Sequence, residues 1–364
     1  MTITTTRVTA RRFLVPVALL TAVVAVGAWW LREDVETVDT VQTPTRAPAP
    51  AAGASAPQAP STAIGTARAQ PLGGVVALAL SPDGRRVAGA GGDGSVRVWD
   101  IDGEPLEVID AHHGLAATAV EFTPDGNSLV SAGMDSEVRV WNANDEFSAQ
   151  HELRAHEHPV SALAVSPDGA LLASAGQETR IMLWDSATGR LQKMLSGHDD
   201  FITDIAFNAD GSQLASASRD KRVLIWDVAS GQVAQTLVGH TDRVNEIHFT
   251  PDGLSLVSAG EDGKIIVWDL RSGTPEREIV GRQGPVEGVS ISADGALLAT
   301  TGRYNEVLLW DRYSGTQVRA IDTGAAVNAL RFGADGRLVV ASATSVVGIW
   351  DAASGQRVAQ WALN

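Results

Sequence analysis

The chain has 364 residues, no cysteine, and 28 basic against 43 acidic residues, which gives a formal net charge of −15. This length can bury a large core, and a hydrophobic content of 44% excludes a wholly disordered chain. The absence of cysteine excludes disulfides, thiolate catalysis and cysteine-bound metals, and the negative charge disfavours nucleic acid and anionic lipid surfaces as partners.

Residues 1–12 carry three arginines and no acid, and nineteen uncharged residues follow from Phe13 to Leu31. At about 1.5 Å per residue, a helix of this length just crosses a hydrocarbon core roughly 30 Å thick. Trp29-Trp30 suits an interfacial aromatic belt, and the N-terminal arginines favour a cytoplasmic N-terminus. We therefore predict a cytoplasmic segment at 1–12 and a transmembrane signal anchor at 13–31.

A cleaved signal peptide is the main alternative for this stretch, because Val26-Gly27-Ala28 offers small residues for cleavage. The anchor is favoured because the run is longer than most signal-peptide cores and because Trp29-Trp30 would be an unusual mature N-terminus. A buried core helix is disfavoured, since the stretch has no polar face. Residues 32–64 are rich in Ala and Pro and lack periodicity, so they are predicted to be a disordered linker with a reach of roughly 30 Å.

From residue 65 onward one unit recurs seven times. In residues 239–269, apolar residues that alternate with polar ones predict a first strand, and Asp252-Gly253 predicts a tight turn. Residues 254–259 are predicted to form a second strand, and residues 264–268 a third strand that ends in Trp-Asp. Successive closing tryptophans lie 40 to 43 residues apart; they are Trp99, Trp141, Trp184, Trp226, Trp268, Trp310 and Trp350. A fourth strand follows each tryptophan, and this period is typical of a four-stranded propeller blade.

The repeated motif resembles the WD-repeat (WD40-type) β-propeller family over about residues 65–364. The resemblance implies an all-β, seven-bladed propeller of four-stranded antiparallel blades. Two segments compete for the outer strand of the last blade, residues 66–72 near the start of the repeats and residues 356–363 at the C-terminus. The C-terminal segment is preferred because it keeps every blade local in sequence.

The resemblance also implies a buried His–Ser–Asp–Trp network inside each regular blade. The members are His113, Ser131, Asp135 and Trp141; His156, Ser174 and Trp184, with Glu178 replacing Asp; His198, Ser216, Asp220 and Trp226; and His240, Ser258, Asp262 and Trp268. Blades 1, 6 and 7 depart from the pattern, with Gly89 in place of Ser and with Arg282 and Tyr304 in place of His and Asp. We expect these three blades to be locally less stable.

Repetition of the Asp-His-Ser set argues against a hydrolase triad, because a catalytic site is usually single. The densest histidine cluster, His151, His156 and His158, is not assigned to metal because His156 belongs to the network. No nucleotide-binding, haem-attachment or calcium-loop motif occurs in the sequence. Outside the repeat pattern, we expect no histidine, arginine or acidic residue to face the central channel. We predict a non-enzymatic protein without cofactor or metal.

Family members often bind partners on the narrow top face, and the resemblance places two loops of each blade there. The predicted partner-binding residues are Met134, His158, Gln177, Phe201, Arg219, Arg243, Glu261 and Arg303, with Glu157, Thr241 and Gln283 beside them. Arg and large aromatic residues are the types that anchor interfaces. The alternative is an ordinary solvated rim.

The sequence as a whole favours a membrane-anchored scaffold or adaptor that binds membrane or periplasmic proteins and no nucleic acid. Its expected location is the inner membrane of a bacterial cell, single-pass, with the propeller on the periplasmic side; the alternative is release into the periplasm after signal cleavage. An accessory or sensory subunit of a larger membrane complex is the second functional hypothesis. A propeller hydrolase or oxidoreductase is the least favoured.

Overall fold

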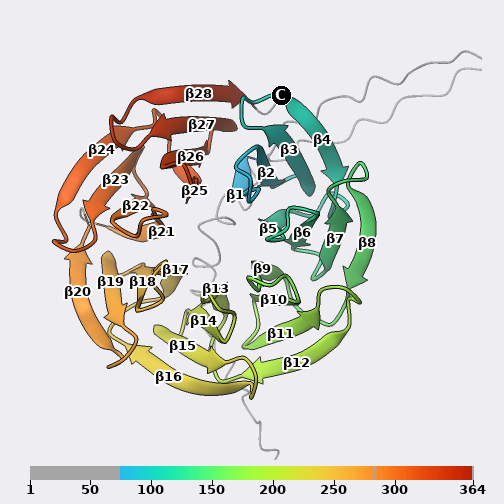
Figure 1. The fold of residues 1–364 in the computed structure, drawn as a ribbon, viewed down its shortest axis with the longest axis horizontal. Helices are drawn as coiled ribbons and strands as arrows, with labels where there is room; N and C mark the ends of the chain where they lie inside the picture. Colours follow the sequence, from blue (N-terminus) through green and yellow to red (C-terminus); the bar gives the residue numbers. More distant parts are fainter. Residues whose placement is uncertain (1–73, 282–283, 363–364) are drawn as a thin grey trace, which may run out of the picture. The chain divides into compact units, whose positions relative to one another are not determined.

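The computed structural model describes residues 74–281 and 284–362, which form seven four-stranded antiparallel sheets around a central axis (Figure 1). The prediction of a seven-bladed all-β propeller is therefore confirmed. The predicted cytoplasmic segment, signal anchor and linker lie outside the described residues. In the parts of the chain that are described, no helix has the length and hydropathy needed to span a membrane.

Each blade uses four consecutive strands, from the axis outward, so that blade 1 is β1–β4 and blade 7 is β25–β28. The innermost strands are β1 (Val75–Leu80), β5 (Ala117–Phe122), β9 (Val160–Val165), β13 (Ile202–Phe207), β17 (Val244–Phe249), β21 (Val286–Ile291) and β25 (Val327–Phe332). The second strands are β2 (Arg86–Gly91), β6 (Ser128–Gly133), β10 (Leu171–Gly176), β14 (Gln213–Ser218), β18 (Ser255–Gly260), β22 (Leu297–Gly302) and β26 (Arg337–Ser342).

The third strands, which end at or just after the closing tryptophan, are β3 (Ser95–Asp100), β7 (Val138–Asn142), β11 (Arg180–Asp185), β15 (Arg222–Asp227), β19 (Lys264–Asp269), β23 (Glu306–Asp311) and β27 (Val346–Asp351). The outer strands are β4 (Pro105–Asp110), β8 (Ser148–Leu153), β12 (Leu191–Ser196), β16 (Gln232–Val238), β20 (Thr274–Val280), β24 (Gln317–Asp322) and β28 (Arg357–Ala362).

The hairpin between the first two strands explains why Asp-Gly recurs. In blade 5, Gly253 has φ +68°, a left-handed conformation that glycine adopts without steric cost. Its amide donates to Thr250 O at 2.8 Å, and Asp252 Oδ1 accepts the amide of Leu254 at 2.9 Å. The aspartate therefore satisfies a backbone donor that the turn itself leaves free.

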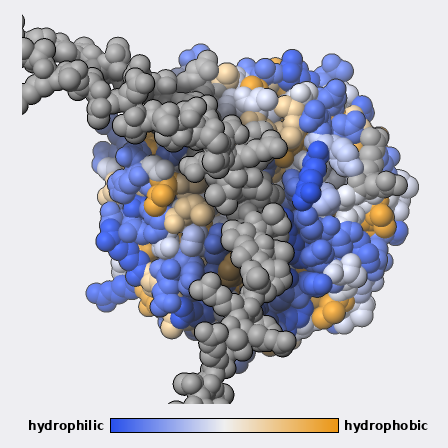
Figure 2. Space-filling view, turned by 180° about the vertical axis from the view of Figure 1, so that it is seen from behind, coloured by the Kyte–Doolittle hydropathy of each residue, from blue (hydrophilic) through white to orange (hydrophobic). Residues whose placement is uncertain are grey.

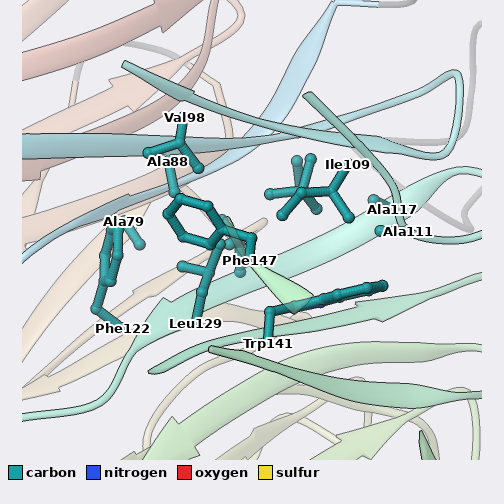
Figure 3. Close-up of a cluster of buried hydrophobic side chains, with 13 residues drawn as sticks. Ala79, Ala88, Val98, Ile109, Ala111, Ala117, Phe122, Leu129, Trp141 and Phe147 are labelled. Carbon is teal, nitrogen blue, oxygen red and sulfur yellow. The ribbon is translucent and has the colours of Figure 1, made fainter. Parts of the chain in front are cut away.

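The hydrophobic core lies between blades. The cluster drawn in Figure 3 joins Ala88 and Val98 of blade 1 to Phe122, Leu129 and Trp141 of blade 2, and the other interfaces between neighbouring blades have equivalent clusters. Second and third strands are buried on both faces, and small residues on the second strands let neighbouring sheets approach closely.

The C-terminal strand closes the last blade, as preferred from the sequence. β28 pairs with β27, with Trp361 opposite Val347. Blade 7 then packs on blade 1: Trp361 lies 6.5 Å from Trp99 between ring centroids, and Asn328 Nδ2 donates to Val75 O at 3.0 Å. Gly103 lies against the Trp361 ring, where an added Cβ would come within 2.7 Å. In the described residues, the ring is therefore closed by side-chain packing of blade 7 on blade 1.

Candidate functional site

Blade 4 contains the complete polar network. The Trp226 indole N–H donates to Ser216 Oγ at 2.8 Å, Ser216 Oγ is 2.7 Å from His198 Nε2, and His198 Nδ1 is 2.7 Å from Asp220 Oδ2. Because an indole N–H can only donate, the serine accepts there and offers its own proton to His198 Nε2. The imidazole then carries its proton on Nδ1 and donates it to the carboxylate. Every buried polar group in the set is satisfied.

Blades 3 and 5 repeat this arrangement. Blade 5 uses the expected four residues, His240, Ser258, Asp262 and Trp268, at 2.7 to 3.0 Å. In blade 3, Ser174 links Trp184 to His156, and Glu178 takes the place of the aspartate at His156 Nδ1. Burial lowers the pKa of His156, although Glu178 opposes the shift. The imidazole is thus kept neutral inside the blade and is unavailable to a substrate.

The histidine predicted for blade 2 was wrong. His112, and not His113, lies 3.0 Å from Ser131 Oγ and 2.8 Å from Asp135 Oδ1. In blades 3 to 5 the histidine precedes the serine by 18 residues, a spacing that points to His113, but in blade 2 the separation is 19. The extra residue is absorbed by left-handed His113 and Gly114, at φ +50° and +81°, and the His113 side chain is 71% exposed.

Two of the network carboxylates, Asp135 and Asp220, stay ionised. Burial alone would raise the pKa of Asp135, but hydrogen bonds from His112 and Arg139 outweigh it and lower that pKa to about 2. Burial likewise opposes ionisation of Asp220, yet contacts with His198 and Arg222 leave its pKa below the ordinary value. These carboxylates therefore act as fixed acceptors and do not serve as general acids near neutral pH.

Blades 1, 6 and 7 lack the full network. Gly89 has no hydroxyl to accept the Trp99 indole, and Asp93 pairs with Arg97 at 3.0 Å. In blade 6, Thr300 accepts the Trp310 indole at 2.8 Å, while Tyr304, in the place of Asp, is exposed and Arg282 lies outside the described residues. Blade 7 has Val340 at the serine position.

The predicted partner-binding residues occupy matching loops, where the second strand ends and the inner strand begins. The Arg219 amide donates to Phe201 O at 3.0 Å, and the Glu261 amide donates to Arg243 O at 2.9 Å. The Met134 and Gln177 amides donate in the same way to Ala116 O and Pro159 O. His158 and Arg303 are exposed on the corresponding loops, as are Glu157 and Thr241, whereas Gln283 lies outside the described residues.

These side chains contact one another within blade 4 and between blades 5 and 6. The Arg219 guanidinium stacks 5.4 Å from the Phe201 ring centroid. Glu261 bridges Arg243 and Arg303, at 3.1 and 2.8 Å, and Arg303 also reaches Glu287 at 3.2 Å. Of the arginines predicted as interface anchors, Arg243 and Arg303 are therefore held in a charge network and Arg219 is held against Phe201.

The central channel contains charged residues that the sequence analysis missed, so the expectation of a channel without His, Arg or acid was wrong. The third and fifth residues of the inner strands share a face, and nine of these fourteen positions are Ala, Gly or Ser. The exceptions are Asp204 and Glu246 at the third position and Glu121, His248 and Arg331 at the fifth. Aligning the seven inner strands with one another would have revealed these exceptions.

Arg331 of blade 7 reaches across the channel to blade 5, where its Nη1 lies 2.5 Å from Glu246 Oε1. His248 Nε2 lies 3.5 Å from the same oxygen. Elsewhere, His151 Nε2 contacts Ala187 O at 3.1 Å and His156 is committed to its network, so the three histidines of that cluster do not converge. No group of three possible metal ligands occurs among the described residues.

Comparison with known families gives a clear match. The family described as WD40 (WD domain, G-beta repeat) matches residues 65–100, 103–142, 147–185, 189–227, 231–269 and 273–311. After the first, each match begins near an outer strand and ends with the third strand of the next blade, so the sequence repeat is offset from the structural blade. Comparison with curated proteins gave no match. The matched segments cover more than half of the chain, which therefore belongs to the WD40 repeat family.

Proposed function

We propose that this protein is a non-enzymatic adaptor that binds partner proteins through the top face of blades 4 to 6. WD40 propellers generally mediate protein–protein interactions. The observation that carries the proposal is the group of interacting Arg, Glu and Phe side chains on this part of the ring. Arginine and aromatic anchors dominate interface energetics, and side chains already held by neighbours lose less entropy when a partner binds.

Large side chains are concentrated on one part of the top face, which supports a localised docking site. In blade 1 the matching loop residues are Gly74 and Gly92, and in blade 7 they are Ala326 and Ala343. Blades 4 and 5 carry large side chains at both of these positions. A partner would therefore find side-chain contacts on one arc of the ring and mostly backbone on the other.

The partner is expected to be recognised mainly by polar contacts. The part of the propeller surface visible in Figure 2 is largely hydrophilic, with isolated hydrophobic spots. Asp199 of blade 4, paired with Arg222 at 2.6 Å, and Asp242 of blade 5 are also exposed, so charge complementarity would guide docking.

The proposal places the propeller beyond an N-terminal membrane anchor at residues 13–31, connected by the linker at 32–64. The support is the uncharged run, the preceding arginines and Trp29-Trp30. In a bacterial cell this topology puts the propeller in the periplasm.

The test is affinity purification of the tagged full-length chain from gently solubilised membranes, beside a chain lacking residues 13–31. We expect the full chain in the membrane fraction with a reproducible set of partners, and the shortened chain outside that fraction. A fixed stoichiometric assembly would favour the accessory-subunit role. A mature N-terminus near residue 29 would contradict the anchor, and recovery of the folded protein alone would contradict the adaptor role.

A further inference from the structure

Two carboxylates in the channel each accept a hydrogen bond from a backbone amide of the next blade. Asp204 of β13 accepts the Ile247 amide of β17 with Oδ2 at 2.9 Å. Glu246 of β17 accepts the Val289 amide of β21 with Oε2 at 2.9 Å. Glu246 has its other oxygen on Arg331, and its side chain is only 15% exposed. Asp204 has no such cation: its second oxygen accepts the amide of Ile205 at 2.9 Å.

The two acids have opposite protonation preferences. Burial raises the pKa of Asp204 to about 7, and the neighbouring charge of Glu246 adds to the shift. Burial also disfavours ionised Glu246, but Arg331, His248 and the Val289 amide together outweigh this and lower its pKa to about 2. Two interacting carboxyl groups beside one guanidinium titrate as a pair, and the acid without the guanidinium keeps its proton to higher pH.

The remaining titratable groups around Asp204 are few. β17 contributes Glu246 and His248, and β25 contributes Arg331. Glu121 of β5, whose pKa is raised by burial, lies near Arg331 and His248. The strands β1, β9 and β14 contain no ionisable channel residue, and Glu287 of β21 pairs with Arg303 on the top face. Among the described residues, Arg331 is therefore the permanent cation that compensates the cluster.

We propose that this cluster is a proton-binding site of the channel, in which Asp204, the acid without a cation partner, carries a proton while Glu246 stays ionised on Arg331, and in which Asp204 releases that proton to solvent as the pH rises through neutral. Loss of that proton adds a second negative charge, which competes with Glu246 for Arg331. The ion pair between blades 5 and 7 weakens, so the ring is less stable with Asp204 ionised than with Asp204 protonated. The site thus makes the rigidity of the propeller responsive to pH, independently of its partner.

The sign of the effect follows from linkage. The folded-state pKa of Asp204 is above its unfolded value of 3.8, so the stability it contributes is fully present below about pH 4 and is lost as the pH rises toward 7. Histidines elsewhere contribute equally to the protein and to its Asp204 variants. The difference in pH-dependent stability between the unsubstituted chain and an Asp204 variant therefore reports the contribution of the cluster.

The experiment measures urea unfolding of the full-length chain between pH 5.5 and 8, with Asp204→Asn and, as control, Asp102→Asn at an exposed carboxylate. Between these pH values the unfolding equilibrium constant of the unsubstituted chain is expected to rise at least about tenfold more than that of Asp204→Asn. Asp102→Asn should follow the unsubstituted chain. Parallel profiles for all three proteins would overturn the proposal.

A second measurement does not depend on the folding of Asp204→Asn, because its main readout comes from the unsubstituted chain. In the unsubstituted chain labelled with ¹³C-aspartate, one side-chain carboxyl carbon should titrate with a midpoint between pH 6 and 8, and Arg331→Met should move that midpoint upward. If every aspartate titrates below pH 5, the proton-binding site does not exist.

Discussion

Ser216 shows how a single hydroxyl holds a blade together. It accepts the Trp226 indole proton and contacts His198, and all three side chains are buried. Neither aromatic group has another polar partner at those atoms among the described contacts. Removing the hydroxyl leaves an indole donor and an imidazole nitrogen unsatisfied in the core.

Ser216→Ala is therefore expected to lower the free energy of unfolding by about 2 to 4 kcal/mol, because each orphaned buried group costs roughly 1 to 3 kcal/mol. Urea denaturation measures the difference. Ser212→Ala, which removes an exposed hydroxyl from the adjoining turn, is the matched control and should be nearly neutral. Equal stability of the two variants would show that the network contributes little.

Blades that contain a complete polar network should be locally more stable than blades that do not. Blades 2 to 5 each contain a buried His–Ser–carboxylate–Trp set, whereas blades 1, 6 and 7 keep only parts of it. The three incomplete blades adjoin one another across the closure, where Trp361 packs on Trp99. The weakest arc of the ring is thus expected at this closure.

Native-state hydrogen exchange tests this expectation. Backbone amides of the second and third strands of blades 1, 6 and 7 should exchange sooner than their equivalents in blades 3 to 5, because local opening there breaks fewer buried polar contacts. If the slowest exchange occurs in blades 1, 6 and 7, the prediction that these blades are the least stable is contradicted.

Sequence reasoning succeeded where the determinants are local. Asp-Gly turns and closing tryptophans lie within a few residues of the strands they delimit, so strand order, blade number and the closing strand could be predicted. The choice between His112 and His113 depended on one extra residue, which two left-handed residues of a loop absorb. The channel cluster required the closed ring, because it pairs Arg331 of blade 7 with Glu246 of blade 5, which lies 85 residues earlier in the chain.

At the scale of the whole molecule, the propeller is a rigid ring with two distinct charged regions. The channel cluster links blades 5 and 7, while the top-face residues interact within blade 4 and between blades 5 and 6. The first region is proposed to respond to protons and the second to bind protein. Substitutions in one should leave the other intact.

The most direct test of the adaptor role compares two four-site variants in partner binding. One combines Phe201→Ala, Arg219→Ala, Arg243→Ala and Arg303→Ala on the top face. The control combines Tyr313→Ala, Arg190→Ala, Arg271→Ala and Arg357→Ala, one aromatic residue and three arginines that follow the third strands and so lie at the opposite ends of the blades. With both proteins folded, we predict that only the top-face variant loses the partners recovered with the unsubstituted chain. Undiminished recovery by that variant would contradict the account.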